Sequence, residues 1–75
     1  MTVEQIISKV FNVDLEQVDD LSSRDTIEGW DSMGHLTLIT ELEEQFRVSI
    51  AIADAVEMVE VRKIKALLPS YGVKC

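Results

Sequence analysis

Hydrophobic positions near the start of the chain recur with the spacing of an amphipathic helix. One face of such a helix collects the apolar residues Val3, Ile6, Ile7 and Val10. Thr2 and Gln5 stand three residues apart, as in a capping box, where side chains and backbone at a helix start bond to one another. The pattern therefore predicts a first helix within Met1 to Asn12, with its apolar face in the core.

A longer amphipathic pattern covers Ser32 to Phe46. On a helical wheel at about 100° per residue, one side is apolar and we expect it to be buried. It consists of Leu36, Ile39, Leu42 and Phe46, with Leu38 at its edge. The outward side collects Met33, Thr37, Thr40, Glu41 and Glu44. Asp31 is suited to cap this helix, because a carboxylate accepts hydrogen bonds from the free N–H groups at a helix start.

Two shorter helical patterns follow a connector at Arg47 to Ala53, in which we expect Ile50 and Ile52 to turn inward. A short third helix is predicted at Asp54 to Met58. It would carry Ala55, Val56, Met58 and the following Val59 toward the core. The last helix is predicted at Val61 to Leu68, where Pro69 stops it. Its apolar stripe is Val61, Ile64, Leu67 and Leu68.

The segment from Val13 to Trp30 has no sustained period and is interpreted as a long loop, with one helical turn near Leu15 to Val18. Long loops in compact domains are uncommon and often functional. Its expected apolar anchors are Leu15, Val18, Leu21 and Ile27, and we expect Trp30 to pack at the edge of the core. The chain is therefore predicted to be all-α: a small four-helix bundle with a long loop between the first two helices.

Composition agrees with a single folded domain over residues 1–75. The hydrophobic fraction is 47% and the charged fraction 28%, as in globular chains. The one cysteine, Cys75, cannot form an internal disulfide, which favours a reducing, cytoplasmic setting. No apolar run approaches the roughly 18 residues of a membrane span, and the start lacks the basic and apolar regions of a signal peptide. We expect a monomer.

The chain has 7 basic and 14 acidic residues and a net charge of −7. This charge argues against nucleic acid as a partner, because phosphates would be repelled. It favours basic patches on partner proteins, with association steered electrostatically. Alternatively, the acidity only keeps a small protein soluble.

The residues needed for catalysis are sparse. No Cys/His cluster indicates a metal, and no glycine-rich loop indicates a phosphate site. His35 follows Ser32 by three residues, but a Ser–His dyad also needs an orienting group and an oxyanion hole. We therefore expect His35 to cover the core edge or to contact a partner. Gly34 would leave room beside Ser32 for a bulky adduct.

The run Asp31-Ser32-Met33 resembles the Asp-Ser-Leu motif of acyl carrier proteins and of the related peptidyl and aryl carriers. The resemblance continues through Leu36, Ile39, the run Leu42-Glu43-Glu44-Gln45-Phe46 and Ile50, and extends loosely from Thr2 to Leu68. It implies a phosphoprotein whose serine, Ser32, carries a covalent 4′-phosphopantetheine arm taken from coenzyme A. Acyl groups are held on the thiol of this arm as thioesters. The chain would be a carrier and not itself an enzyme.

The resemblance also implies partners. A phosphopantetheinyl transferase would modify Ser32 and supply the base and the metal, with Asp31 close to that metal. An acyl- or aminoacyl-activating ligase would load the arm, and synthases or acyltransferases with basic docking patches would use the cargo. Met33, Glu43 and Glu44 are the residues we expect at these partners.

The chain departs from the common pattern of fatty-acid biosynthesis, because Gly34, His35 and Thr37 stand where acids often follow the serine. The alternatives are a fatty-acid or polyketide carrier, an aminoacyl or peptidyl carrier (including a D-alanyl carrier), or an unmodified acidic adaptor of the same fold.

Overall fold

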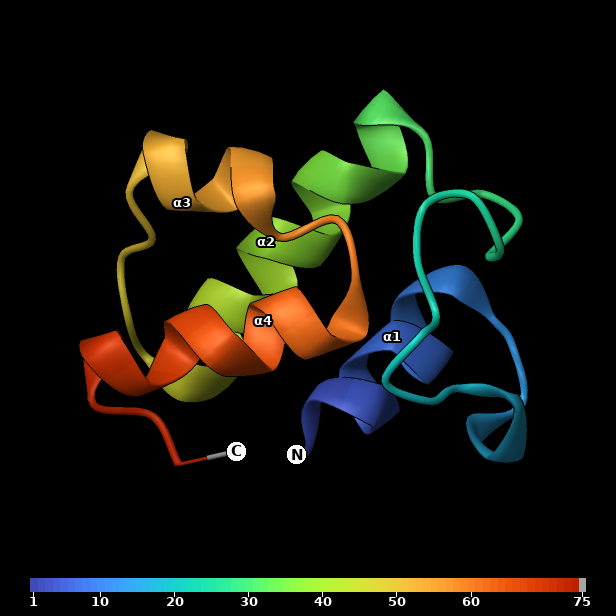
Figure 1. Cartoon of the computed structure of the whole chain (residues 1–75), viewed down its shortest axis with the longest axis horizontal. Coiled ribbons are helices and arrows are strands. Elements are labelled where there is room, and N and C mark those ends of the chain that lie inside the picture. Colours follow the sequence, from blue (N-terminus) through green and yellow to red (C-terminus); the bar gives the residue numbers. More distant parts are fainter. Residues whose placement is uncertain (75) are drawn as a thin grey trace.

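The structure, a computed structural model, describes residues 1–74, so Cys75 and our interpretation of its thiol lie outside the described residues. Six helical elements follow one another along the chain (Figure 1). They are α1 (Val3–Phe11), η1 (Leu15–Gln17), α2 (Ser32–Phe46), α3 (Ile52–Glu57), α4 (Val61–Leu67) and η2 (Leu68–Tyr71). The prediction of an all-α bundle with four helices, a long loop after the first and a short third is confirmed.

Helix α1 begins at the predicted capping box. The Thr2 hydroxyl accepts a hydrogen bond from the Gln5 backbone N–H at 3.1 Å, and the Gln5 side chain accepts one from the Thr2 backbone at 2.8 Å. The helix ends at Asn12, which is in the left-handed conformation with φ 54°. Its predicted apolar face is confirmed: Val3, Ile6 and Ile7 are fully buried and Val10 packs against the core.

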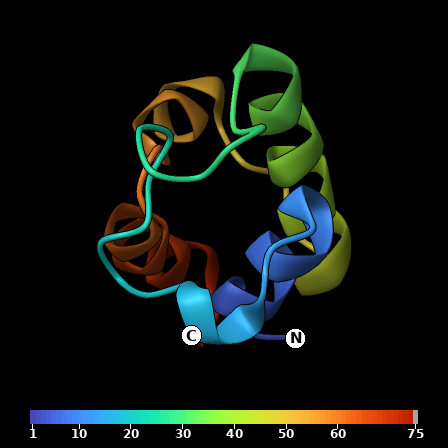
Figure 2. The same ribbon diagram turned by 90° about the vertical axis from the view of Figure 1, so that its right-hand side faces the viewer.

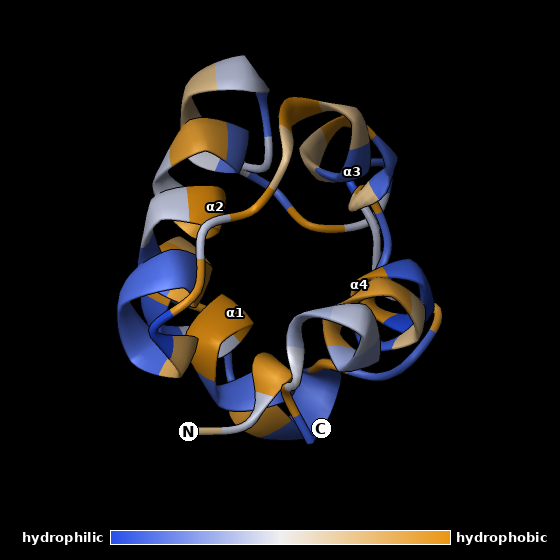
Figure 3. Ribbon diagram, turned by 90° about the vertical axis from the view of Figure 1, so that its left-hand side faces the viewer, coloured by the Kyte–Doolittle hydropathy of each residue, from blue (hydrophilic) through white to orange (hydrophobic). Residues whose placement is uncertain are grey.

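The predicted rotation of α2 is wrong in one respect. Leu38 and Leu42 are fully buried, Ile39 and Phe46 are partly buried, and Leu36 is 66% exposed. Leu36 lies roughly 160° around the helix from Leu38, so the two cannot share one buried face. Including Leu36 shifted the predicted stripe away from the side of α2 that packs on α1, the helix beside it (Figure 3).

The loop between α1 and α2 contains the predicted helical turn, η1. It then runs beside α4 to the start of α2 (Figure 2). Val18 and Ile27 are buried as expected, but Leu15 and Leu21 are 48% and 66% exposed and are not anchors. The loop is held in place by its backbone instead, because the Arg24 backbone N–H donates a hydrogen bond to the Val59 carbonyl at 3.1 Å.

The same loop caps α4. No side chain caps this helix, and its first two backbone N–H groups, of Val61 and Arg62, donate to the carbonyls of Ser22 and Asp20. Free N–H groups at a helix start must find partners when they are buried, so the loop and α4 depend on each other. Lys65 of α4 adds hydrogen-bonded ion pairs to Asp20 and Glu4, which raise its pKa.

Helix α3 differs most from its predicted form. It begins two residues before Asp54 and ends at Glu57, and none of its residues is buried. Ile52 and Val56, which we expected to face inward, are 84% and 65% exposed. Ile50 before the helix and Met58 after it are buried as predicted. Ala55 of α3 is partly buried and packs against the core as predicted. The chain on either side of α3 therefore enters the core, while α3 itself lies at its surface.

Helix α4 agrees with its prediction, except that Leu68 begins a 3-10 turn, η2, which includes Pro69. Val61, Ile64 and Leu68 are fully buried, and Leu67 packs at the core edge. On the opposite side of the bundle, Lys9 of α1 pairs with Glu41 of α2 at 2.7 Å. This hydrogen bond is the main cause of the lowered pKa of the Glu41 carboxyl.

Gly34, in the first turn of α2, has a role that we did not predict. A Cβ atom at this position would lie 2.2 Å from the carbonyl oxygen of Gly29 and 2.9 Å from the ring of Phe11. Gly29 itself has φ +90°, which a glycine adopts without strain. The missing side chain of Gly34 therefore lets the loop approach α2 closely, and it does not provide room for an adduct on Ser32.

We expect Leu38→Ala to lower the free energy of unfolding by about 2–5 kcal/mol, because it leaves a cavity among fully buried side chains. Leu36→Ala should change it by less than about 0.5 kcal/mol, because Leu36 is mostly exposed. Chemical denaturation followed by circular dichroism measures both. Equal losses in the two variants would show that the buried side of α2 has been assigned incorrectly.

Gly34→Ala should lower the free energy of unfolding by about 1–3 kcal/mol, because the new methyl group would force the Gly29 backbone away from α2. Alanine is otherwise the better helix former by about 1 kcal/mol. Thr37→Ala, at an exposed position of the same helix, is the control and should change stability little. A Gly34→Ala variant more stable than the original chain would contradict the close approach.

Candidate functional site

Ser32 lies at the surface as the first residue of α2. The helix begins there because Asp31 caps it: its backbone is extended, and its Oδ1 accepts a hydrogen bond from the Gly34 N–H at 2.8 Å. Within residues 1–74, neither the Ser32 hydroxyl nor the second carboxylate oxygen of Asp31 forms a hydrogen bond. An accessible hydroxyl and a carboxylate oxygen thus stand side by side at the helix start.

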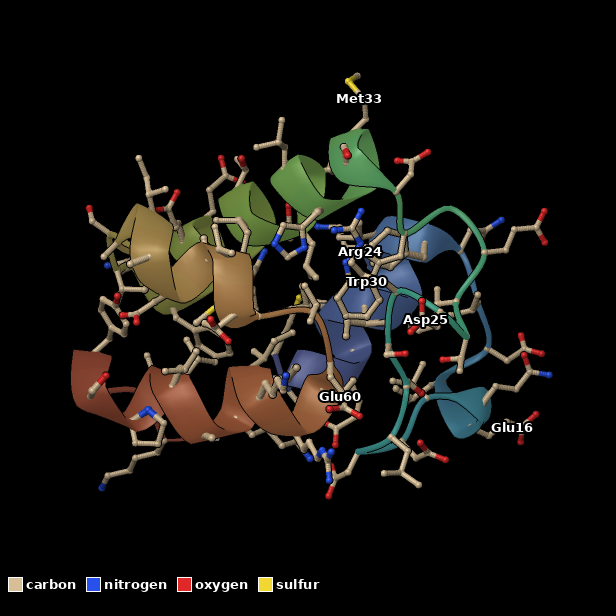
Figure 4. All side chains as sticks on the ribbon, turned by 45° about the horizontal axis from the view of Figure 1, so that its top comes forward. Glu16, Arg24, Asp25, Trp30, Met33 and Glu60 are labelled. Atoms are coloured by element: carbon tan, nitrogen blue, oxygen red, sulfur yellow. The ribbon has the colours of Figure 1, made fainter. Side chains whose placement is uncertain are left out.

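Trp30 anchors the end of the loop, as expected from the sequence. Its side chain is only 3% exposed, and its indole stacks on the ring of Phe11 with centroids 5.3 Å apart. Figure 4 shows Trp30 pointing into the molecule and Met33 pointing away from it. The chain thus passes from a buried anchor to an exposed helix start within two residues, which fixes the place of Ser32.

His35 joins this anchor to α3. The Trp30 indole N–H donates a hydrogen bond to Nδ1 of His35 at 3.0 Å, and Nε2 lies 2.7 Å from the carbonyl oxygen of Ala55. An indole N–H can only donate and a carbonyl can only accept, so the imidazole is neutral with its proton on Nε2. Both ring nitrogens are therefore engaged away from Ser32, and the imidazole is not placed to activate the hydroxyl.

The surface beside Ser32 is apolar. Met33 is 76% exposed and Leu36 is 66% exposed, one turn further along α2. A groove of about 340 Å³ lies between α2 and α3, and most of its lining is apolar. The apolar side chains that line it are Leu36, Ile39, Ile50, Ile52, Ala55 and Val56. Sequence reasoning missed this surface, because it assigned Leu36, Ile52 and Val56 to the core.

The two glutamates expected at partners lie in different environments. Glu44 is exposed, but Glu43 is partly buried and its Oε2 accepts a hydrogen bond from the Ile50 backbone N–H at 2.8 Å. The Glu43 side chain thus holds the connector between α2 and α3. Glu43 therefore has a structural role that the sequence did not indicate, because its carboxylate satisfies a backbone donor at a half-buried position.

Within residues 1–74, no group of three or more His, Cys, Asp and Glu side chains is arranged to hold a metal ion. No helix in the described part of the chain is long and apolar enough to cross a membrane.

Comparison with known families links this geometry to a cofactor. A family model described as "Phosphopantetheine attachment site" matches residues 2–68, which include all four α-helices and the start of α2. Comparison with individual curated proteins gave no match. Members of the matching family carry 4′-phosphopantetheine covalently and are not catalytic themselves. Since the match covers most of the chain, this protein belongs to the family of phosphopantetheine-binding carrier proteins.

Proposed function

We propose that Ser32 is the residue that carries the 4′-phosphopantetheine arm. The strongest support is the state of the Ser32 hydroxyl. Ser32 is exposed at the start of α2, and its hydroxyl forms no hydrogen bond within residues 1–74. Most other serine hydroxyls are engaged: those of Ser8, Ser22, Ser23 and Ser70 each take part in a hydrogen bond. Ser49 is also exposed, but it follows α2 instead of starting a helix.

In the modification that we propose, the Ser32 hydroxyl oxygen attacks the pyrophosphate of coenzyme A. A phosphodiester bond to the serine forms, the pyrophosphate bond breaks, and adenosine 3′,5′-bisphosphate leaves. A transferase supplies the base that takes the hydroxyl proton and the metal that balances the phosphate charge. The unbonded oxygen of Asp31 would face that metal, while its other oxygen holds the helix start in place.

We further propose that the cargo is an acyl group used in fatty-acid, polyketide or related biosynthesis. Once attached, the arm supplies a thiol that holds the cargo as a thioester. The groove between α2 and α3 supports an acyl cargo, because His35 and Leu36, one turn after Ser32, line it together with the apolar side chains of α3. Each CH₂ group buried there would contribute about 0.8 kcal/mol. A small aminoacyl group, such as the D-alanyl group, would use little of this surface.

The partner enzymes of this proposal meet Met33, Leu36 and Glu44. An enzyme that reaches Ser32 must cover Met33 and Leu36, because both are exposed within about one turn of the serine. Met33 is flexible enough to fill pockets of different shapes. Glu44 would meet a basic residue at the rim of the interface, and Glu43 would contribute its charge while it holds Ile50. The transferase, an activating ligase and a synthase or acyltransferase would share this surface.

Ser32→Ala should abolish modification. The variant and the original chain are incubated with a phosphopantetheinyl transferase and coenzyme A, and intact mass is measured. We expect the original chain and the control Ser49→Ala to gain the mass of one arm, and Ser32→Ala to gain none while it keeps its helical circular dichroism. A mass gain on Ser32→Ala would assign the arm to another residue, and an original chain that never gains mass would favour the unmodified adaptor.

Glu44→Lys should slow the modification of Ser32 severalfold and make its rate less sensitive to salt, because exposed rim charges act mainly on association. Met33→Ala should also slow it, with an unchanged salt dependence. Both variants should melt near the temperature of the original chain.

Glu43→Ala should instead lower the free energy of unfolding by about 1 kcal/mol, through the lost hydrogen bond to Ile50.

The initial rate of arm transfer, measured over a series of salt concentrations, tests these expectations. If Glu44→Lys left both the rate and its salt response unchanged, Glu44 would be only a solvated acid. Partner enzymes would then dock on the Val13–Trp30 loop or on α3 instead of on the outward side of α2.

A further inference from the structure

Helix α3 is attached to the bundle in an unusual way. None of its residues is buried, and no side chain caps its start with a hydrogen bond to the backbone of its first turn. A helix of one to two turns has few backbone hydrogen bonds of its own and is marginal in isolation. Its position must therefore come from the flanking residues and from contacts made by other elements.

The start of α3 is held by polar side chains from other elements. The Tyr71 hydroxyl in η2 accepts a hydrogen bond from the Ala51 backbone N–H at 3.0 Å and donates one to the Asp54 carboxylate. The bond to Asp54 is the largest cause of the raised pKa of the Tyr71 hydroxyl. One residue earlier, Glu43 accepts the Ile50 N–H. These contacts fix the entry to the helix but not its last turn.

The last turn of α3 is held by His35. Its Nε2 donates to the Ala55 carbonyl at 2.7 Å, and the same carbonyl accepts the Met58 backbone N–H at 3.2 Å. The imidazole is fixed on its other side by Trp30, which donates to Nδ1 and stacks on the ring with centroids 6.3 Å apart. One side chain thus joins the buried loop end before Ser32 to the surface helix.

We propose that His35 is a positioning residue. Because it links Trp30 to α3, it sets the position of α3 relative to Trp30. It thereby also sets the width of the groove between α2 and α3. His35 and Ala55 both line this groove. A partner or cargo that moves the loop end at Trp30 would release the last turn of α3, and an occupant that displaces α3 would free the Trp30 indole. The proposal goes beyond the carrier role and does not require the arm to be attached.

His35→Phe tests the proposal in the unmodified protein, because phenylalanine keeps an aromatic ring beside Trp30 but removes both hydrogen bonds. Amide hydrogen exchange is measured by NMR. Exchange of the Met58 amide, which donates to the Ala55 carbonyl in the last turn, should become at least about tenfold faster, as local opening of this turn requires less free energy. The Ile6 amide of α1, bonded to Thr2, is the internal reference and should change little.

Two further variants separate the hydrogen bonds from the shape of the ring. His35→Gln offers an acceptor and a donor on neighbouring atoms and should restore much of the α3 protection. Thr37→Ala, at an exposed position of α2 outside the groove, is the matched control and should leave α3 unchanged. Equal acceleration in α1 and α3, unchanged exchange in α3, or a glutamine variant no better than phenylalanine would each overturn the proposal.

A measurement on the original chain remains decisive if His35→Phe does not fold. Trp30 and His35 are the sole tryptophan and histidine, so each gives one set of side-chain signals. In the original chain, we expect the imidazole to carry its proton on Nε2 and the Trp30 indole N–H to exchange slowly. A proton on Nδ1, or a freely exchanging indole N–H, would overturn the proposal. Neither result depends on modification at Ser32, so the carrier assignment is tested separately.

Discussion

The burial of Trp30 is the constraint on which the rest of the structure depends. The indole packs on Phe11 and donates its N–H to His35, so the end of the long loop is held against α1 and α2. The chain must then reach the surface within two residues to expose Ser32. It does so through the close approach of Gly29 to Gly34, which any side chain at Gly34 would obstruct.

The bundle is divided between helices with buried apolar faces and one, α3, that combines partial packing of Ala55 with polar contacts from other elements. Helices α1, α2 and α4 supply most of the fully buried side chains, whereas α3 supplies none. The loop and α4 stabilise each other through backbone hydrogen bonds, since the loop carbonyls satisfy the free N–H groups at the start of α4. Helix α3 is therefore the part best suited to move, and it borders the groove beside Ser32.

This division explains the chemistry of the surface around Ser32. Because α3 lies outside the core, its residues Ile52 and Val56 remain exposed next to Leu36 of α2. In an acidic chain, the neighbourhood of the serine is thus mainly apolar, with Glu44 further along the helix. The partner surface that we propose therefore combines an apolar pocket with a basic rim, which is more specific than the basic patch expected from net charge alone.

Features that depend on near neighbours could be predicted from the sequence. The capping box at Thr2, the cap at Asp31 and the stripes of α1 and α4 involve residues at most a few positions apart, and the motif around Ser32 is likewise local. The roles of Leu36, Gly34, Glu43 and His35 could not be predicted in this way, because their partners or packing come from segments distant in the chain or across a turn. A wheel shows which residues share a face, but only the packing of the other helices decides which face is buried.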